Sequence, residues 1–204
     1  MTKTKQSSPI GGGGGYIEIM DTTLRDGEQT SGVSFSAAEK LTIAQLLLRE
    51  VKVDRIEVAS ARVSEGEFQA VKQITAWAAE NGYLDKVEVL TFVDGETSVN
   101  WMIEAGATVM NLLTKGSLNH LTHQLKKTAE EHFADIRRVI ELAKSKGISA
   151  NVYLEDWSNG MRNSPEYVFE FLDFLTTQPI SRILLPDTLG VLTPAESYLF
   201  VKSI

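Results

Sequence analysis

Acidic, basic and small polar residues crowd one short run near the N-terminus, DTTLRDGEQ at residues 21–29. A carboxylate such as Asp26 can hold a divalent cation. The neighbouring guanidinium of Arg25 can stabilise a carbonyl oxygen as that oxygen gains negative charge. The same two side chains can also form an ordinary surface ion pair in a polar turn, and their spacing alone does not separate the two interpretations.

Two later segments carry further reactive groups. In the run Asn151–Asp156, strand alternation places Tyr153 and Glu155 on one face together with Asn151. A Glu155 that faces a protein interior needs a metal, an arginine or a substrate proton as its partner, because an unpartnered buried charge is costly. The alternative is that Glu155 caps the next helix or faces solvent. Further on, the turn PDTLG at 186–190 supplies the hydroxyl of Thr188, or is simply a turn before a capped helix.

The metal chemistry open to this chain is limited by its histidines and cysteines. The absence of Cys excludes disulfides, thiolate ligands and a cysteine nucleophile, so a metal would be held by oxygen or imidazole. His120 and His123 stand three positions apart near a helix start and could share a helix face. Solvent-facing or capping roles are the simpler interpretation of both.

The elements that must position these groups alternate regularly from residue 16 onward. Short β-branched or apolar runs predict strands, and they alternate with amphipathic segments that predict helices. The predicted strands cover residues 16–20, 55–59, 87–93, 108–113, 149–154 and 182–186. The pattern is typical of parallel strands joined by crossover helices.

Helix starts are marked by the spacing S/T-x-x-E, in which a hydroxyl and a carboxylate satisfy each other's backbone donors. This spacing begins at Ser36, Ser64, Thr128 and Thr193. Ser164-Pro165 predicts another start, with Pro in the first helical position where its missing N–H costs nothing. A further helix over about 97–104 completes six consecutive βα units.

Six βα units fit either an open doubly wound sheet or part of a (β/α)₈ TIM barrel. A barrel typically holds eight units in roughly 250 residues. Residues 16–204 hold six units, so the number of residues per unit is similar. We therefore expect an α/β fold with about six of the eight units of a TIM barrel. Both folds place their chemistry in the loops after the carboxyl ends of the strands, where the groups described above lie.

Composition excludes several classes of protein. The net charge of −7 offers no electrostatic footprint for nucleic acid, and no apolar run approaches the roughly 18 residues of a membrane span. Residues 1–15 contain five consecutive Gly and no signal peptide; because they precede the first strand, they predict a flexible tail rather than a phosphate loop. The negative charge favours a small-molecule ligand, and the lack of Cys is compatible with a reducing cytoplasm.

From residue 16 to the last residue, the chain resembles the acyl-CoA-dependent 2-oxo acid condensing enzymes, namely the isopropylmalate, citramalate and homocitrate synthases. DTTLRDGEQ at 21–29 carries most of this resemblance. It implies an acyltransferase with a metal-dependent TIM barrel, which joins acetyl-CoA to a small 2-oxo acid and hydrolyses the thioester. Leucine or isoleucine biosynthesis, a divalent Mg²⁺, Mn²⁺ or Zn²⁺ ion and a full-length homodimer are implied as well.

The resemblance assigns roles to individual residues. Arg25 corresponds to the residue that stabilises the keto oxygen, and Asp26 to a carboxylate metal ligand. Glu155 corresponds to the catalytic acid or base, and Thr188 to a contact with the substrate carboxylate. These roles agree with the chemistry that each side chain can perform.

The resemblance also places three residues at the family's pocket for the 2-oxo acid side chain: Leu90, Leu113 and Tyr153. Large apolar residues here resemble citramalate synthases, whose walls fit the methyl group of pyruvate. The preference for pyruvate over 2-oxoisovalerate is slight, because a methylene-scale difference is worth only about 1–3 kcal/mol.

The chain departs from the family pattern in one respect. The family completes its metal site with a His-x-His pair on the seventh strand, and this sequence has no such pair. We therefore expect the chain to be the N-terminal part of a longer enzyme, truncated before strands seven and eight. The remaining His ligands are expected beyond residue 204, and the chain alone should be inactive. The alternatives are another metal-dependent carbon–carbon lyase or transcarboxylase barrel, and a non-catalytic binding or assembly protein.

Overall fold

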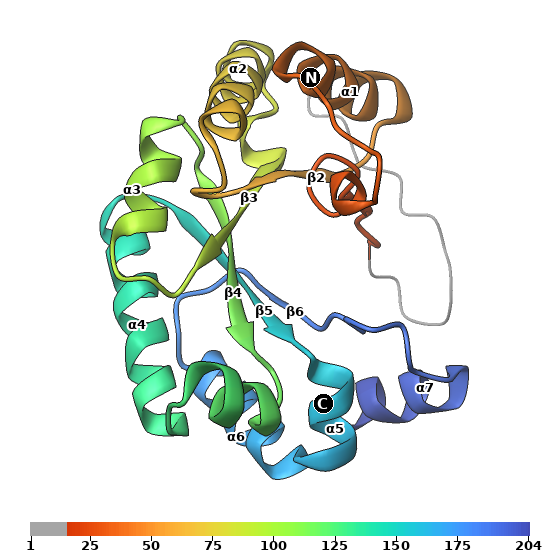
Figure 1. Ribbon diagram of the computed structural model, residues 1–204, viewed down its shortest axis with the longest axis vertical. Helices are drawn as coiled ribbons and strands as arrows, with labels where there is room; N and C mark the ends of the chain where they lie inside the picture. Colours follow the sequence, from red (N-terminus) through yellow and green to blue (C-terminus); the bar gives the residue numbers. More distant parts are fainter. Residues whose placement is uncertain (1–15) are drawn as a thin grey trace.

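A computed structural model describes residues 16–204 and contains one curved sheet of six parallel strands (Figure 1). Each strand pairs with the strand before it in the chain, so the spatial order is the sequence order. The strands are β1 (Met20–Asp21), β2 (Arg55–Ser60), β3 (Val87–Phe92), β4 (Val109–Lys115), β5 (Ser149–Glu155) and β6 (Arg182–Leu184). A doubly wound sheet would reverse its strand order at a switch point, so this sequential order confirms the prediction of a partial TIM barrel.

Helices form an arc around the convex side of the sheet, from α1 and α2 through α3 and α4 to α6 and α5 (Figure 1). The α-helices are α1 (Ala37–Leu46), α2 (Glu65–Asn81), α3 (Thr97–Glu104), α4 (Ala129–Ser145), α5 (Trp157–Asn163), α6 (Pro165–Thr176) and α7 (Pro194–Ser203). Shorter helical segments are η1 (Gly27–Gln29), η2 (Leu47–Val51), η3 (Leu84–Lys86) and η4 (His120–Leu125). No helix of the described chain is both long and apolar enough to cross a bilayer.

The capping signals locate the helix starts correctly. Reciprocal capping boxes form at Ser36, Thr128 and Thr193. At Ser64 only half of the box forms: the hydroxyl accepts from the N–H of Glu67, but the Glu67 carboxylate binds Lys40 instead, at 2.6 Å. The Glu67 carboxylate binds the buried ammonium group of Lys40 rather than the backbone N–H of Ser64, because a hydrogen bond between two charged groups is stronger than one to a neutral N–H.

The predicted range of the first strand is wrong, one helix was not predicted, and one prediction lies outside the described residues. The first strand was expected over 16–20, but only Met20–Asp21 pairs with β2 as a ladder. Helix α5 was not predicted, because its seven residues, WSNGMRN, lack a side-chain capping signal and include the poor helix former Gly160. Gly11–Gly15 and the rest of the predicted tail lie outside the described residues.

The two faces of the sheet differ in chemistry. Toward the helices, strand residues such as Val58 and Leu112 pack in one apolar core with helix residues such as Ile74, Ile136 and Phe171. The other face instead carries buried polar side chains, namely Glu57, Glu88, Asn111 and Asn151. Buried polar groups need partners, so this face is built around hydrogen bonds and ion pairs.

Ion pairs also connect the amino ends of the strands. Arg55 donates to the buried Glu88 carboxylate at 3.0 Å and lies 3.3 Å from Glu18. Glu18 in turn accepts from Arg182 of β6 at 2.7 Å. Glu18 therefore links the segment that enters the first strand to the last strand, across 164 positions of sequence.

Candidate active site

A pocket of about 540 Å³ opens where the carboxyl ends of the strands meet the loops that follow them. All seven residues that the sequence singled out for catalysis, metal binding or substrate binding line it: Arg25, Asp26, Leu90, Leu113, Tyr153, Glu155 and Thr188. Its other lining residues are Gln29, Ser60, Val63, Phe92, Pro186 and Asp187. The barrel topology thus gathers groups that lie up to 163 positions apart in the sequence.

The loop after β1 holds Arg25 and Asp26 in a compact turn. The carbonyl of Thr22 accepts from the N–H groups of Arg25, Asp26 and Gly27, at 2.8 to 3.1 Å. Nη1 of Arg25 donates to Oδ1 of Asp26 at 2.9 Å. The simple ion-pair interpretation is therefore correct as far as it goes. It is not the whole description, because the Arg25 side chain is mostly buried whereas that of Asp26 is 62% exposed.

Lys40 of α1 anchors the same loop from beneath. Its side chain is only 1% exposed, and its ammonium donates to the carbonyl of Leu24 at 3.2 Å. It also pairs with the carboxylates of Glu28 and Glu67. Two carboxylates and a carbonyl compensate the burial of this charge, so the loop that carries Arg25 is tied to α1 and α2.

Glu57 of β2 is a site residue that the sequence analysis missed. It is fully buried and accepts from Nε of Arg25 at 2.5 Å and from Nδ2 of Asn111 at 2.7 Å. Burial raises the pKa of Glu57, although Arg25 and Asn111 both oppose that rise. The available signal was a lone carboxylate in the apolar run RIEVAS, where a charge is unexpected without a partner.

Asn111 and Asn151 extend this contact across the sheet. Oδ1 of Asn111 accepts from Nδ2 of Asn151 at 2.8 Å, so a row of polar groups runs from Arg25 through Glu57 to β5. The row lies on the strand face that also carries Tyr153 and Glu155. The predicted alternation along β5 is therefore correct, with Asn151 pointing the same way as the pocket residues.

Glu155 does not cap the following helix. Its carboxylate forms an ion pair through Oε2 with Lys115, which is its neighbour in the register of β4 and β5. The two side chains are 26% and 16% exposed, respectively. Lys115 was also missed, because only the register of the two strands brings it beside Glu155.

The hydroxyl of Thr188 accepts from the backbone N–H of Asp156 at 2.9 Å. Asp156 adopts a left-handed backbone conformation with φ of 64°, which turns the chain from β5 into α5. Its carboxylate accepts from Ser117 and from Asn159, both at 2.7 Å, and these bonds hold the turn in place. Because the Thr188 oxygen is engaged as an acceptor, its proton remains available to a ligand oxygen.

The three predicted wall residues form the apolar side of the pocket. Leu90 and Tyr153 are 5% and 9% exposed, whereas Leu113 is half-buried. Burial raises the pKa of Tyr153, so its phenol is neutral at physiological pH. Phe92 and Val63 add two apolar groups that the sequence analysis did not name.

The histidines do not join this pocket. His120 and His123 share the segment η4, and Nε2 of His120 lies 3.5 Å from a carboxylate oxygen of Asp156. His132 of α4 is buried and accepts from the N–H of Lys115 at 3.3 Å; burial lowers its pKa to about 4. Among residues 16–204, no group of three or more His, Cys, Asp or Glu is arranged to hold a metal ion.

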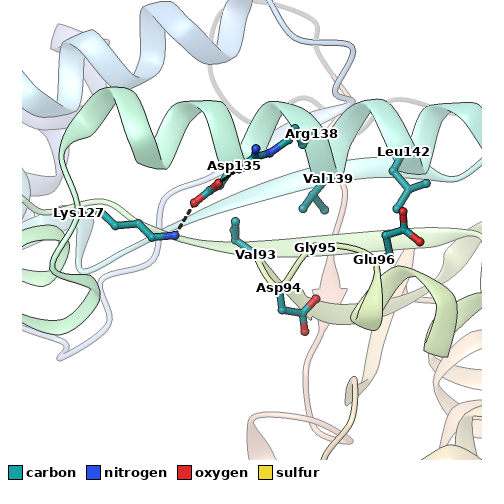
Figure 2. Close-up of a pocket in the computed structure, with 9 residues that line it drawn as sticks. All are labelled: Val93, Asp94, Gly95, Glu96, Lys127, Asp135, Arg138, Val139 and Leu142. Carbon is teal, nitrogen blue, oxygen red and sulfur yellow. Dashed lines mark hydrogen bonds and ion pairs between the residues drawn. The ribbon is translucent and has the colours of Figure 1, made fainter.

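A second pocket of about 420 Å³ lies between the loop after β3 and helix α4. Figure 2 shows Lys127 reaching toward Asp135 of α4, with the apolar side chains of Val93 and Val139 beside this pair. None of the predicted site residues lines it. Most of its charged groups are already paired: Asp135 binds both Lys127 and Arg138, and Asp94 binds Arg62.

Comparisons with known proteins agree with this geometry. The model of the family described as HMGL-like matches residues 16–204. The chain is 35% identical over 188 residues to a Methanopyrus kandleri protein assigned as an (R)-citramalate synthase, covering 92% of this chain and 35% of that protein. It is 34% identical over 190 residues to the 2-isopropylmalate synthase of a Synechocystis species, with 92% and 35% covered. The chain thus spans about a third of the length of these relatives.

Among solved structures, the hydroxymethylglutaryl-CoA lyase of Pseudomonas aeruginosa superposes with a TM-score of 0.67. The match has 16% sequence identity and covers 92% of this chain and 63% of the lyase. At this level of identity the likeness supports the fold alone.

Proposed function

The chain belongs to the HMGL-like family, and from that membership we propose that it carries the oxo-acid part of a condensing active site. The reaction proposed is the addition of acetyl-CoA to a small 2-oxo acid, followed by hydrolysis of the thioester. The observation that carries this proposal is the convergence of Arg25, Glu155 and Thr188 on one pocket with an apolar wall. The synthases among the relatives lend it support.

Arg25 would stabilise the keto oxygen of the 2-oxo acid as the carbonyl carbon is attacked. Its guanidinium is held by Glu57 and Asp26 before any substrate binds. A charge that is fixed in advance does not have to reorganise during the reaction, which is why such groups lower barriers effectively.

Glu155 would take the methyl proton of acetyl-CoA. The C–H bond breaks, an O–H bond forms on the carboxylate, and the electron pair passes into the enolate, which then attacks the carbonyl carbon. Thr188 would donate its hydroxyl proton to the carboxylate of the 2-oxo acid, because its oxygen already accepts from Asp156. The two groups would thus fix the nucleophile and the electrophile at the same pocket.

A divalent metal ion would polarise the keto group and fix the orientation of the 2-oxo acid. Asp26 offers a suitable carboxylate, since it is well exposed at the pocket and only its Oδ1 is engaged by Arg25. The residues of 16–204 do not complete a metal site by themselves. We propose Asp26 as one ligand, with histidines outside this chain as the others; Mg²⁺, Mn²⁺ and Zn²⁺ all suit such a set.

Pyruvate is the 2-oxo acid that we favour over 2-oxoisovalerate. Leu90 and Tyr153 are packed tightly and would leave room for a methyl group more readily than for an isopropyl group. The product would then be citramalate, on the route to isoleucine rather than leucine. We further propose that the complete enzyme is a cytoplasmic homodimer and that this chain alone is inactive.

The proposal is tested with Glu155→Gln in the complete polypeptide that carries this chain. Release of free CoA is followed with acetyl-CoA, Mg²⁺ or Mn²⁺, and either pyruvate or 2-oxoisovalerate. We expect kcat to fall about 10²–10⁴-fold while KM for the 2-oxo acid stays within about threefold, because binding does not use the transferred proton. Glu166→Gln, at an exposed position of α6, is the matched control.

Near-normal CoA release by Glu155→Gln would remove this residue from the proposed role. A complete polypeptide that ignores both oxo acids but cleaves or carboxylates another acyl substrate would favour a lyase or transcarboxylase instead. A stable protein with no turnover and no metal dependence would favour a binding or assembly role.

A further inference from the structure

We propose that Lys115 is a positioning residue that selects which oxygen of Glu155 exchanges the proton. This inference rests on the proposed function, since it concerns the carboxylate assigned to proton transfer. Lys115 engages Oε2 of Glu155 in the ion pair. Within residues 16–204 no donor contacts Oε1, so that oxygen is left to face the substrate.

The backbone of Lys115 is fixed on both sides by buried aromatic side chains. Its N–H donates to Nε2 of His132 from α4, at 3.3 Å, and its carbonyl accepts from the hydroxyl of Tyr167 from α6, at 2.7 Å. Neither helix supplies a residue to the pocket itself. Both contacts therefore act on Lys115, and through it on Glu155.

Packing at the next residue fixes the relative position of the two strand ends. Gly116 donates its N–H to the carbonyl of Glu155 at 2.7 Å. A Cβ on Gly116 would lie 2.7 Å from the carbonyl oxygen of Leu154, and one on Gly160 would lie 2.1 Å from the carbonyl oxygen of Gly116. The ends of β4 and β5 and the middle of α5 are in direct contact, which leaves little freedom for Lys115 to shift.

The ion pair is also better shielded than a typical surface pair. Both side chains are less than a third exposed, so their attraction is screened less than that of a fully exposed lysine and glutamate. A carboxylate held at one oxygen keeps a single orientation, and a misplacement of about 1 Å at a reacting group can cost about 100-fold in rate. Lys115 itself forms and breaks no bond in this scheme.

The test compares Lys115→Met and Lys115→Arg in the complete polypeptide. We expect Lys115→Met to lower kcat about 10- to 100-fold with KM for pyruvate changed less than about threefold. Arginine retains the charge and can still bind Oε2, so Lys115→Arg should recover part of the lost rate. Lys127→Met is the matched control, because it breaks a lysine–carboxylate pair in the other pocket (Figure 2).

A double-mutant cycle with Glu155→Gln separates positioning from general damage. If Lys115 acts through Glu155, Lys115→Met should lower kcat less than about twofold in the Glu155→Gln background. An equal loss in both backgrounds, or an unchanged kcat in the single variant, would overturn the proposal.

A crystal structure of Lys115→Met gives a readout that does not depend on turnover. We expect the Glu155 carboxylate to leave its present orientation or to occupy more than one. A Glu155 that stays in place would overturn the role of Lys115 whatever substrate the enzyme uses. Failure of the proposed function alone would instead appear as a complete polypeptide that does not turn over either oxo acid.

Discussion

Nε of Arg25 lies 2.5 Å from Oε2 of Glu57, and this contact joins the loop after β1 to the middle of β2. Glu57 is fully buried, whereas Arg25 reaches the pocket with part of its guanidinium. The Arg25 guanidinium thus contacts the Glu57 carboxylate on one side and borders the pocket on the other. Its orientation depends on Glu57 as much as on its own loop.

Glu57→Gln should weaken both stability and turnover. Removal of one partner from a buried ion pair leaves the other charge uncompensated, so we expect the free energy of unfolding to fall by about 3 kcal/mol. Urea unfolding of variant and parent measures this loss. Glu50→Gln, at an exposed position of η2, should change stability by less than about 0.5 kcal/mol. An unaltered midpoint for Glu57→Gln would show that the pair contributes nothing to the fold.

Leu113→Ala should widen the pocket and shift its preference toward larger oxo acids. The ratio of kcat/KM for 2-oxoisovalerate to that for pyruvate should rise about 10-fold or more, since a methylene-scale change in an apolar pocket is worth about 1–3 kcal/mol. Leu112→Ala is the control, because Leu112 is the next residue along β4 and packs in the helix-facing core. It should lower stability and leave the ratio unchanged; a shift in the ratio by both variants would contradict the assignment of the wall.

Gly160→Ala should be strongly destabilising although it lies in a helix. The new Cβ would stand 2.1 Å from the carbonyl oxygen of Gly116, so α5 would have to move away from β4. Overpacking of this kind typically costs about 1–3 kcal/mol, and rigid backbone on both sides favours the upper end. In contrast, Gly66→Ala in α2 meets only Ser64 at 3.6 Å and should be neutral or stabilising by up to about 1 kcal/mol. In thermal melts, the melting temperature of Gly160→Ala should therefore fall below that of the parent, whereas that of Gly66→Ala should stay the same or rise.

The buried His132 should make stability fall at acid pH. Burial, with a smaller contribution from Lys127, lowers its pKa to about 4, below the value of about 6.5 expected in the unfolded chain. The unfolded state therefore binds a proton first, and the stability contributed by neutral His132 is complete above about pH 6.5 and lost progressively down to about pH 4. The full difference between the pKa of His132 in the unfolded and the folded chain corresponds to about 3 kcal/mol in the free energy of unfolding.

His132→Gln removes this titration while keeping an acceptor for the N–H of Lys115. Urea unfolding of both proteins between pH 7 and pH 4 measures the difference. The parent should lose more stability than the variant over that interval. Parallel losses would show that His132 does not titrate in the way its burial implies.

The sequence predicted most of the fold because most of its elements are specified locally. Capping residues such as Ser36 and Thr128 define where helices begin, and β-branched runs define the strands. The order of the strands follows from connections that are short and of one hand. The missed helix α5 depends instead on tertiary contacts, since it has only seven residues, contains Gly160 and has no side-chain cap at its start.

Several residues that line the pocket could also be predicted, because Arg25, Asp26, Glu155 and Thr188 carry reactive groups in loops or at strand ends. The wall residues Leu90 and Leu113 carry no such group and were predicted from the family resemblance. The residues that support them, such as Lys115, could not be predicted. Such a residue is recognised by its position beside a pocket residue in the folded sheet, and its residue type alone does not reveal that position. Lys115 is an unremarkable strand-end lysine until β4 and β5 are aligned. Lys40, likewise, sits in a helix stripe like any surface lysine, yet its side chain is only 1% exposed.

The sequential strand order has a consequence for how the chain is assembled. Each βα unit after the first finds its pairing surface in the unit made just before it, so packing can advance from the N-terminus as the ribosome releases the polypeptide. The bond between Glu18 and Arg182 is different, because it cannot form until β6 has been synthesised. That contact would therefore form late, and it would stabilise the curvature of a sheet whose earlier strands are already paired.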